Sequence, residues 1–285
     1  MILLSIITIN RNNAAGLEKT MSSVLAQTFT GFEYVVVDGA STDGSVDVIR
    51  RYAEKFGERM KWVSEPDAGI YNAMNKGMQM ATGEYFQILN SGDSLVSEDV
   101  TERVLMQIEK RGEPAIIYGN MIKCFPDGRK MLSKGFEGKP ISMLGMYTGT
   151  LNHNPTYIRR DMFEKYGYYD EALKIVSDWK WFYQAIIVGG EKPQYFDINV
   201  TFFDMCGISE TNLSLRNLEK RSMLEEMVNP TVLADYDAWA DSIDQMRRLK
   251  RHPWAYRLVW FLERCLFKWE KALKRNSDRR MFINS

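Results

Sequence analysis

The stretch SEPDAGIYNAMNKGMQMATGEYFQILNSGDS, residues 64–94, decides the fold that we predict for this chain. Its apolar residues recur at helical spacing from Ile70 to Ala81, TG at 82–83 ends that pattern, and 84–89 predicts a short strand. If this strand is a central parallel one, its carboxyl end delivers NSGD at 90–93 to the crevice where open α/β sheets bind ligands. The stretch therefore predicts a helix and a strand flanked by Asp67 and Asp93 at a ligand site.

The residues before this stretch alternate between strands and helices. Apolar runs at 3–9, 34–37 and 61–63 are typical of parallel strands that are covered on both faces. Between them, helical spacing predicts one helix near 17–25 and another over 45–56, with Ser45 as its cap. This alternation implies right-handed βαβ units and a mostly parallel sheet.

The pattern after Asp93 is less regular. It predicts helices and strands in this order: a helix from about 97, a strand at 115–118, a hairpin over 121–132, a strand at 151–159, helices at 161–166 and 179–188, and a strand at 201–205. From Leu215 onward the pattern is helical. We expect one core with an appendage, since 285 residues suit a single α/β unit.

Composition is that of an ordinary globular protein with a formal net charge of zero. Three widely spaced cysteines without a CxxC pair argue against a disulfide framework or zinc site and fit a reducing cytosol. The apolar start lacks a cationic region and is too short to span a bilayer, so we expect no signal peptide or membrane helix. Residues 247–280 carry twelve Lys and Arg against three Asp and Glu, so the tail raises a separate functional question.

Two motifs carry a family resemblance. TINR at 8–11 and VVVDGASTDG at 35–44, taken with 64–94, resemble the family 2 glycosyltransferases, and most closely their colanic-acid and capsule-type members. The resemblance covers roughly 1–210. It implies an α/β fold of the GT-A nucleotide-diphospho-sugar transferase kind, with a mostly parallel central sheet flanked by helices. We place the catalytic domain at 1–214, with a nucleotide-binding half (1–100) and an acceptor half (101–214), and a helical extension at 215–285.

Asp38 ends the second predicted strand, where a carboxylate can accept hydrogen bonds from a nucleobase or ribose. The residues alone favour an ordinary turn aspartate. The resemblance implies instead that the Thr8 region and Asp38 hold the base and ribose, often of uridine. Many family members have DDGS where this chain has DGAS at 38–41, so one carboxylate is missing here.

The helix after Asp67 lines the donor site that the resemblance implies. Its N-terminal N–H groups suit a diphosphate, Lys76 is a further candidate, and the alternative for Asp67 is an ordinary N-terminal acid. His153, in LNHNPTYIRR, resembles a histidine that faces the donor phosphates in the closest subgroup; a buried structural histidine is the alternative. We predict that the donor nucleotide is bound by these residues: Thr8, Asn10, Asp38, Asp67, Asn90, Ser91 and His153.

Asp93 is the predicted metal ligand. Mg²⁺ and Mn²⁺ prefer carboxylate oxygens, completed here by phosphate oxygens of a nucleotide. Most transferases of this architecture carry at least two aspartates after this strand, whereas NSGD at 90–93 has one, with Asn90 as a helper. We therefore predict a divalent cation, Mn²⁺ or Mg²⁺, on Asp93; a plain NSGD turn is the alternative.

Asp178 is the predicted catalytic base. An inverting transfer needs a carboxylate beside the acceptor hydroxyl to remove its proton. SDWKW at 177–181 matches the position of the family's Glu-Asp motif at a helix start, where the aspartate is the base, and a helix cap is the alternative. Trp179 and Trp181 are typical of a core, although either could stack on an acceptor ring. GIS at 207–209 resembles a family loop that closes over the donor, with Cys206 in place of its first glycine.

We predict a metal-dependent, inverting glycosyltransferase of the hexosyltransferase type. It would move a sugar from a nucleotide diphosphate sugar to a glycan or lipid-linked acceptor in cell-surface polysaccharide synthesis. A UDP-sugar is the favoured donor. A scaffold that binds nucleotide sugar without activity is the alternative, suggested by the single carboxylate of NSGD. A nucleotidyltransferase would need a Gly-rich phosphate loop, which 10–16 is not.

The basic tail has its own pattern. From Trp254 to Trp269, apolar residues recur at helical spacing with Arg and Lys between them, so 247–280 could lie on an anionic membrane surface. Packing on the core or on a second subunit is the alternative. Nucleic acid is not expected as a partner, because no nucleic-acid module accompanies the charge. We expect a cytoplasmic protein, with this tail as the candidate for peripheral attachment to the inner face of the membrane.

Overall fold

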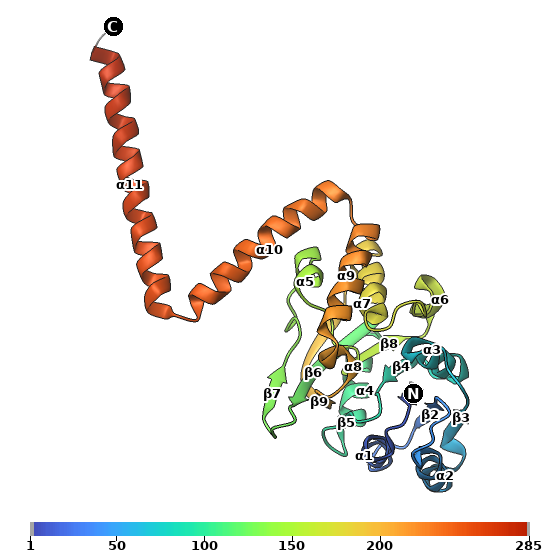
Figure 1. Cartoon of the computed structure of the whole chain (residues 1–285). Coiled ribbons are helices and arrows are strands. Elements are labelled where there is room, and N and C mark those ends of the chain that lie inside the picture. Colours follow the sequence, from blue (N-terminus) through green and yellow to red (C-terminus); the bar gives the residue numbers. More distant parts are fainter. Residues whose placement is uncertain (1–2, 284–285) are drawn as a thin grey trace. The chain divides into compact units, whose positions relative to one another are not determined.

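The computed structural model describes the backbone of residues 3–283, and the side chains of 3–271 other than Ile208, Asp241, Ile243, Asp244 and Arg247. It divides the chain into two compact units, Met1–Met227 and Val228–Ser285. Figure 1 shows the elements of both units in sequence colours. The first unit is longer than the predicted catalytic domain, because the helix Leu213–Met227 belongs to it.

Within the described residues, the strands of the first unit form one nine-stranded sheet of order β3-β2-β1-β4-β8-β6-β9-β5, with β7 paired to β6. The strands are β1 (Leu4–Asn10), β2 (Phe32–Asp38), β3 (Met60–Ser64), β4 (Tyr85–Ile88), β5 (Ser94–Leu95), β6 (Ile116–Cys124), β7 (Lys130–Ser133), β8 (Thr156–Arg159) and β9 (Gln194–Asp204). β1 to β4 are mutually parallel, as predicted. β8 runs antiparallel between β4 and β6, so the second half of the sheet is mixed.

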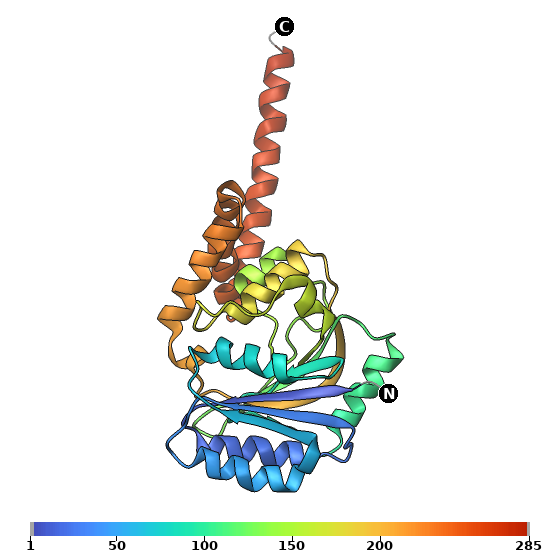
Figure 2. The same ribbon diagram turned by 90° about the vertical axis from the view of Figure 1, so that its right-hand side faces the viewer.

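Helices cover both faces of the parallel half of the sheet (Figure 2). The first unit contains α1 (Ala14–Leu25), α2 (Ser45–Phe56), η1 (Gly57–Arg59), α3 (Ile70–Met80), α4 (Val100–Lys110), α5 (Met143–Thr148), α6 (Asp161–Tyr166), α7 (Ser177–Phe182), η2 (Tyr183–Val188), α8 (Ile208–Thr211) and α9 (Leu213–Met227). Figure 2 shows α1 and α2 on one face and α3 on the other. Every residue of β1 and β2 is buried between these layers, which explains their continuous apolar sequences.

A glycine sets how closely α3 packs on the sheet. A Cβ at Gly77 would lie 2.5 Å from Cγ2 of Ile7 in β1, so a larger residue would push the helix outward. The adjacent Met74 and Met78 are also buried against this side of the core. The close approach holds the N-terminus of α3 at the carboxyl edge of the parallel strands, where the predicted ligand residues lie.

One local prediction is wrong, and the bounds of another differ by two residues. Gly44, with φ of 93°, is the N-cap of α2, and Ser45 is its first helical residue; the Asp43 carboxylate accepts hydrogen bonds from both the Ser45 backbone N–H and its hydroxyl. The helix predicted at 179–188 begins earlier, at Ser177, and its last part is the π-helix η2. A wider π turn shifts the register of the side chains after Tyr183, which the regular helical spacing in the sequence could not indicate.

The second unit consists of α10 (Pro230–Lys250) and α11 (Pro253–Ile283), which contact each other. Asn229 caps α10, since its side chain accepts a hydrogen bond from the Thr231 backbone N–H at 3.0 Å. Residues 3–283 include no helix that is long and apolar enough to cross a membrane. The side chains of Arg247 and of 272–280, part of the predicted basic tail, lie outside the described ones.

Candidate active site

A cavity of about 1090 Å³ lies at the carboxyl ends of the parallel strands of the first unit. Its walls come from the end of β1, the start of α3, the loop after β4, the loop before β8, the start of α7, and α8 and α9. It brings together most of the predicted site residues, which are Asn10, Asp67, Asn90, Ser91, Asp93, His153 and Asp178. Thr8 and Asp38 are absent from this lining.

Asp93 is a buried carboxyl held by two neutral donors. Its Oδ1 accepts a hydrogen bond from the backbone N–H of Asp204 at 2.9 Å, and its Oδ2 accepts one from Nδ2 of Asn154 at 3.3 Å. The side chain is only 3% exposed. Burial raises the pKa of Asp93 to about 6, and these hydrogen bonds and the His153 ring offset only part of that rise.

Asp178 has a partner on each carboxylate oxygen. Oδ1 lies 3.0 Å from the Tyr71 hydroxyl of α3, and Oδ2 lies 3.3 Å from Nδ1 of His153. The Tyr71 hydroxyl is also 2.6 Å from the carbonyl of Ile175, so its one proton is shared between two acceptors. Burial raises the pKa of Tyr71, and the charge of Asp178 raises it further, so the hydroxyl stays protonated. The carboxylate is thereby held in one orientation with a face toward the cavity.

His153 joins the two carboxyl groups. Its Nδ1 faces Asp178, and its Nε2 lies 3.3 Å from Nδ2 of Asn90, in the loop that carries Asp93. Burial alone would lower the pKa of His153, but the hydrogen bond and charge of Asp178, together with the charge of Asp93, raise it. The predicted metal ligand and the predicted base therefore belong to one hydrogen-bonded cluster.

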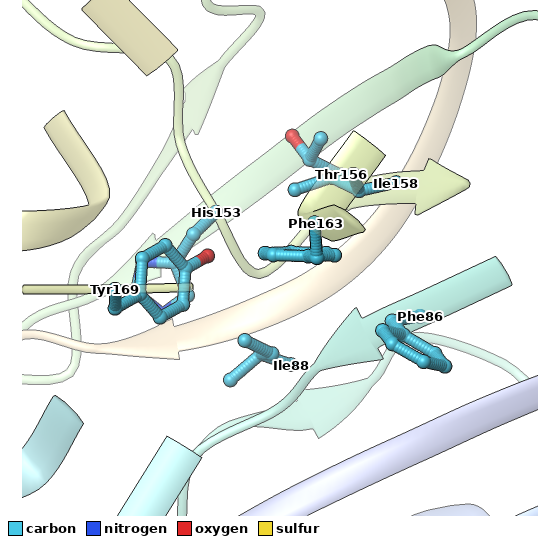
Figure 3. A pocket seen from close by; sticks show the side chains of 7 residues that line it. All are labelled: Phe86, Ile88, His153, Thr156, Ile158, Phe163 and Tyr169. Atoms are coloured by element: carbon cyan, nitrogen blue, oxygen red, sulfur yellow. The ribbon is translucent and has the colours of Figure 1, made fainter. Parts of the chain in front are cut away.

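The ring of His153 borders an apolar pack of side chains that line one small pocket (Figure 3). The side chains in this pack come from β4, β8, α6 and the segment that follows α6; they are Phe86, Ile88, Thr156, Ile158, Phe163 and Tyr169. Thr156 is 1% exposed and Tyr169 is 4% exposed. Because these neighbours are themselves buried in the core, the imidazole has little freedom to turn away from Asp178.

Thr8 and Asp38 lie behind the cavity wall. The Thr8 hydroxyl donates to the carbonyl of Leu89 at 2.8 Å, and both side chains are fully buried. Burial would raise the pKa of Asp38, but hydrogen bonds from Ser41, Ser64 and Asn10 lower it. With its oxygens occupied in this way, Asp38 orders the strand ends and holds Asn10, which does line the cavity.

Asp67 takes the space that a second aspartate of a DDGS motif would need. A Cβ at Gly39 would lie 2.2 Å from Oδ2 of Asp67, so a side chain at that position would displace the carboxylate. Oδ1 of Asp67 accepts a hydrogen bond from the Gly69 backbone N–H at 3.1 Å and lies 3.8 Å from Nη1 of Arg11. The Asp67 carboxylate therefore lies against Gly39, the position at which a DDGS motif carries its second aspartate.

The start of α3 lines the cavity, and Lys76 does not contribute its charge to this wall. Gly69, Ile70 and Tyr71 line the cavity at this helix end. The Nζ of Lys76 pairs with Glu65 at 2.7 Å and donates to the Pro66 carbonyl, so its charge is used locally. Positive polarity at this wall comes from the free N–H groups of the first turn.

The side chains of this cavity provide part of the ligand set of a divalent cation. The described residues contain no cluster of three His, Cys, Asp or Glu side chains arranged for a metal. However, the buried Oδ1 of Asn90 has no hydrogen-bond partner, and the Asp93 carboxylate lies in the same turn. One carboxylate, one amide oxygen and the oxygens of a diphosphate form a ligand set that Mg²⁺ or Mn²⁺ accepts. Asp93 and Asn90 are thus the residues that fit such an ion.

Four residues that sequence reasoning missed also line this cavity: Tyr71, Asn154, Asp204 and Lys220. Asp204 ends β9, and an aspartate at a strand end is the same signal that singled out Asp38. Asn154 follows His153 directly. The sequence carries no comparable signal for Tyr71, which reaches Asp178 from the buried face of α3. Trp179 and Trp181 are 3% and 1% exposed, so both belong to the core.

The sequence of this chain matches that of known glycosyltransferases. A sequence model described as Glycosyl transferase family 2 matches residues 5–168. A "PGL/p-HBAD biosynthesis glycosyltransferase" of Mycobacterium bovis is 29% identical over 222 residues, which cover 77% of this chain and 84% of the relative. An uncharacterized glycosyltransferase of Mycobacterium tuberculosis is 30% identical over 188 residues, covering 65% and 69% of the two chains.

Solved structures share the fold. Residues 1–349 of Staphylococcus aureus TarS in complex with UDP align with a TM-score of 0.59 and 19% identity, covering 70% of this chain and 60% of that one. The mannosyltransferase PcManGT of Pyrobaculum calidifontis, in complex with GDP-Man and Mn²⁺, aligns with a TM-score of 0.55 and 19% identity, over 70% and 56% of the two chains. The chain thus spans less than two thirds of either solved protein. The predicted GT-A-like α/β fold is confirmed.

Proposed function

The chain belongs to glycosyl transferase family 2, and from this we propose that it transfers a sugar from a nucleoside diphosphate sugar to a hydroxyl group of a glycan or lipid-linked acceptor. The observation that carries the proposal is that Asp67, Asp93 and Asp178 all line one cavity. One cavity thereby offers carboxylates for three tasks: to bind the nucleoside, to bind a cation and to act as the base. The curated relative from M. bovis, a glycosyltransferase by name, supports this reading.

The donor's nucleoside would lie against Asn10 and Asp67. Both line the cavity at the carboxyl ends of β1 and β3, where α/β folds bind nucleotides. The base and ribose offer N–H and O–H donors, for which the Asp67 carboxylate is a suitable acceptor. A uridine nucleotide is the favoured donor, as UDP in the fold neighbour TarS suggests. Thr8 and Asp38 would support this wall from behind.

The diphosphate would lie between the start of α3 and the 90–93 turn. N–H groups in the first turn of α3 would bind its oxygens, with Ser91 as a further donor. Asp93 and Asn90 would hold a divalent cation, Mn²⁺ or Mg²⁺, which when bound would neutralise charge on the leaving diphosphate. The structure of PcManGT with GDP-Man and Mn²⁺ supports the use of such an ion within this fold.

Asp178 would remove the proton of the acceptor hydroxyl. Tyr71 and His153 hold the two oxygens of its carboxylate, so the base is oriented before substrate arrives. Attack from the side of Asp178, opposite the leaving diphosphate, inverts the anomeric carbon. His153 would act here through Asp178 and Asn90, rather than only through the donor phosphates.

A thermal-shift panel of UDP, GDP, CDP and ADP, each with and without Mn²⁺, tests the proposal. One nucleoside diphosphate at about a hundred times its Kd should add roughly 2.7 kcal/mol of stability, or about 5 °C in Tm, and only with Mn²⁺ present. No shift with any nucleotide would refute the donor site. Binding without any transfer or sugar release would point instead to a binding scaffold.

We also propose that α11 attaches the protein to an anionic membrane surface, where a lipid-linked acceptor would be found. Within the described part of this helix, Trp254, Leu258, Leu262 and Trp269 are at least half exposed on one face. Arg257, Arg264 and Lys268 lie along one edge of that face at helical spacing. This arrangement suits a helix lying in the headgroup region, with peripheral attachment at the inner face of the cytoplasmic membrane.

Sedimentation with vesicles tests the tail. Replacing Arg257, Arg264 and Lys268 together by Gln should weaken binding to phosphatidylglycerol vesicles about a hundredfold, since each cation contributes about 1 kcal/mol. The same change at Lys55, Lys110 and Lys192, in the first unit, is the control and should have little effect. If the wild-type protein ignores anionic vesicles, or instead self-associates through this helix, membrane attachment is wrong.

A further inference from the structure

Lys220 is a partly buried cation in the cavity wall that the proposed reaction does not use. It lies on α9, outside the residues 5–168 that match the family. Its Nζ donates to the carbonyl of Gly149 at 2.8 Å and lies 5.0 Å from the centroid of the Trp179 ring. Among the described side chains it forms no ion pair with a carboxylate. A lysine has three N–H donors, so Lys220 keeps donors for a ligand in the cavity.

The position of Lys220 relative to the base separates it from the metal turn. Trp179, over which its Nζ lies, is the residue after Asp178, and the charge of Asp178 acts on Lys220. His153 is the group that lies between Asp178 and the Asn90 turn. Lys220 therefore lies beside the segment that carries Asp178. Among the described side chains, none of its hydrogen bonds or ion pairs links it to the 90–93 turn.

The described carboxylates near Lys220 already have other partners. Arg216, one helical turn earlier on α9, also lines the cavity; its Nη1 donates to the Ser209 carbonyl and lies 3.5 Å from Glu210. The Glu219 carboxylate is occupied by the backbone N–H groups of Lys174 and Ile175. Burial, together with the charge of Arg216, lowers the pKa of Lys220 to about 8, against the opposing effect of Asp178. An anion here would relieve this repulsion.

We propose that Lys220, together with Arg216, binds a phosphate group of the acceptor substrate, so that the acceptor is a phosphorylated or lipid-phosphate-linked glycan. The inference rests on the proposed function, because it takes Asp178 to mark the acceptor hydroxyl. An acceptor sugar whose hydroxyl lies at Asp178 would place its own phosphate linkage toward α9. Lysine and arginine are the side chains that bind phosphate most often.

The alternative role for Lys220 is structural. A lysine that donates to Gly149, the residue after α5, stabilises a helix end, and its stem covers Trp179. Lys220→Met keeps the stem and removes only the charged group. A purely structural lysine would then change the melting temperature and leave anion binding unchanged. The two roles therefore predict different results for the same variant.

The test is calorimetric titration of inorganic pyrophosphate into the full chain, with excess Mg²⁺ and a saturating nucleoside diphosphate that fills the donor site. The wild-type protein should bind pyrophosphate at this second site, and Lys220→Met should bind it at least about tenfold more weakly, as expected for loss of a charge-assisted hydrogen bond. Arg216→Gln, an independent variant, should weaken binding in the same direction. Lys192→Met, at an exposed lysine outside the cavity, should match the wild type.

Three other outcomes would contradict the acceptor-phosphate proposal, and a fourth would contradict the proposed function instead. Absence of pyrophosphate binding to the nucleotide-loaded wild type, or equal binding by Lys220→Met, would overturn it. A tenfold loss of nucleoside diphosphate binding in Lys220→Met would assign the lysine to the donor and overturn the acceptor assignment. If no nucleotide binds but pyrophosphate binding still depends on Lys220, the anion site stands and the proposed function fails.

Discussion

Asp178→Asn is expected to lower kcat for sugar transfer about a thousandfold while leaving nucleotide binding within a few fold of the wild type. General-base catalysis contributes typically about 10² to 10⁴ in rate, and the amide cannot accept the proton of the acceptor hydroxyl. The substitution keeps the size of the side chain, so Tyr71 and His153 retain a neighbour of the same shape. Steady-state transfer rates with calorimetric nucleotide Kd values would measure both effects.

Asp170→Asn is the matched control for this variant. Asp170 makes the same kind of side-chain contacts nearby, with Lys180 at 2.7 Å, but it does not line the cavity. Loss of the Asp170 carboxylate should leave kcat within a few fold of the wild type.

Tyr71→Phe removes one partner of the Asp178 carboxylate and keeps the ring. This variant should lower kcat less than Asp178→Asn does, with KM little changed. If the folded Asp178→Asn variant transferred sugar at the wild-type rate, Asp178 would not be the base.

Asp93→Asn should weaken Mn²⁺-dependent nucleotide binding by at least about a hundredfold. The variant keeps an oxygen for the Asp204 backbone N–H, but it loses the negative charge that a hard divalent cation requires. Calorimetry with the nucleoside diphosphate, with and without Mn²⁺, would show the metal-dependent gain disappear. Asp47→Asn on the exposed surface of α2 is the control and should bind like the wild type.

The stability of Asp93→Asn distinguishes lost binding from lost folding. The folded pKa of Asp93, about 6, lies above its ordinary value of 3.8, so the folded protein holds this proton more tightly than the unfolded chain. The ionised carboxylate therefore destabilises the fold increasingly as pH rises from about 4 to 6, and by about 3 kcal/mol at pH 7. Without ligands at pH 7, Asp93→Asn should melt no lower than the wild type. Unaltered Mn²⁺-dependent binding in this variant would exclude Asp93 as the ligand.

The elements that could be predicted from sequence are those whose pattern is local. β1, β2 and the pair α3 and β4 follow from apolar runs and helical spacing, and the structure has them within a few residues of the predicted bounds. The insertion of β8 between β4 and β6 could not be predicted, because a local residue pattern does not show which distant strands pair with each other. The same limit applies to Tyr71, which meets Asp178 across the fold.

The roles predicted for Thr8 and Asp38 show a second limit. A strand with one exposed face alternates between apolar and polar residues, so its sequence shows which way each side chain points. β1 and β2 are buried on both faces and carry no such alternation. The sequence could therefore place Thr8 and Asp38 at the right edge of the sheet, but it could not show that both side chains turn into the protein while Asn10 lines the cavity.

Gly39 and Asp67 occupy a single volume between two loops, since a Cβ on one would overlap the carboxylate of the other. A side chain at 39 would therefore require the Asp67 carboxylate to turn aside, which couples the two positions. Among homologues, an acid at 39 should accompany a residue at 67 that leaves this volume free.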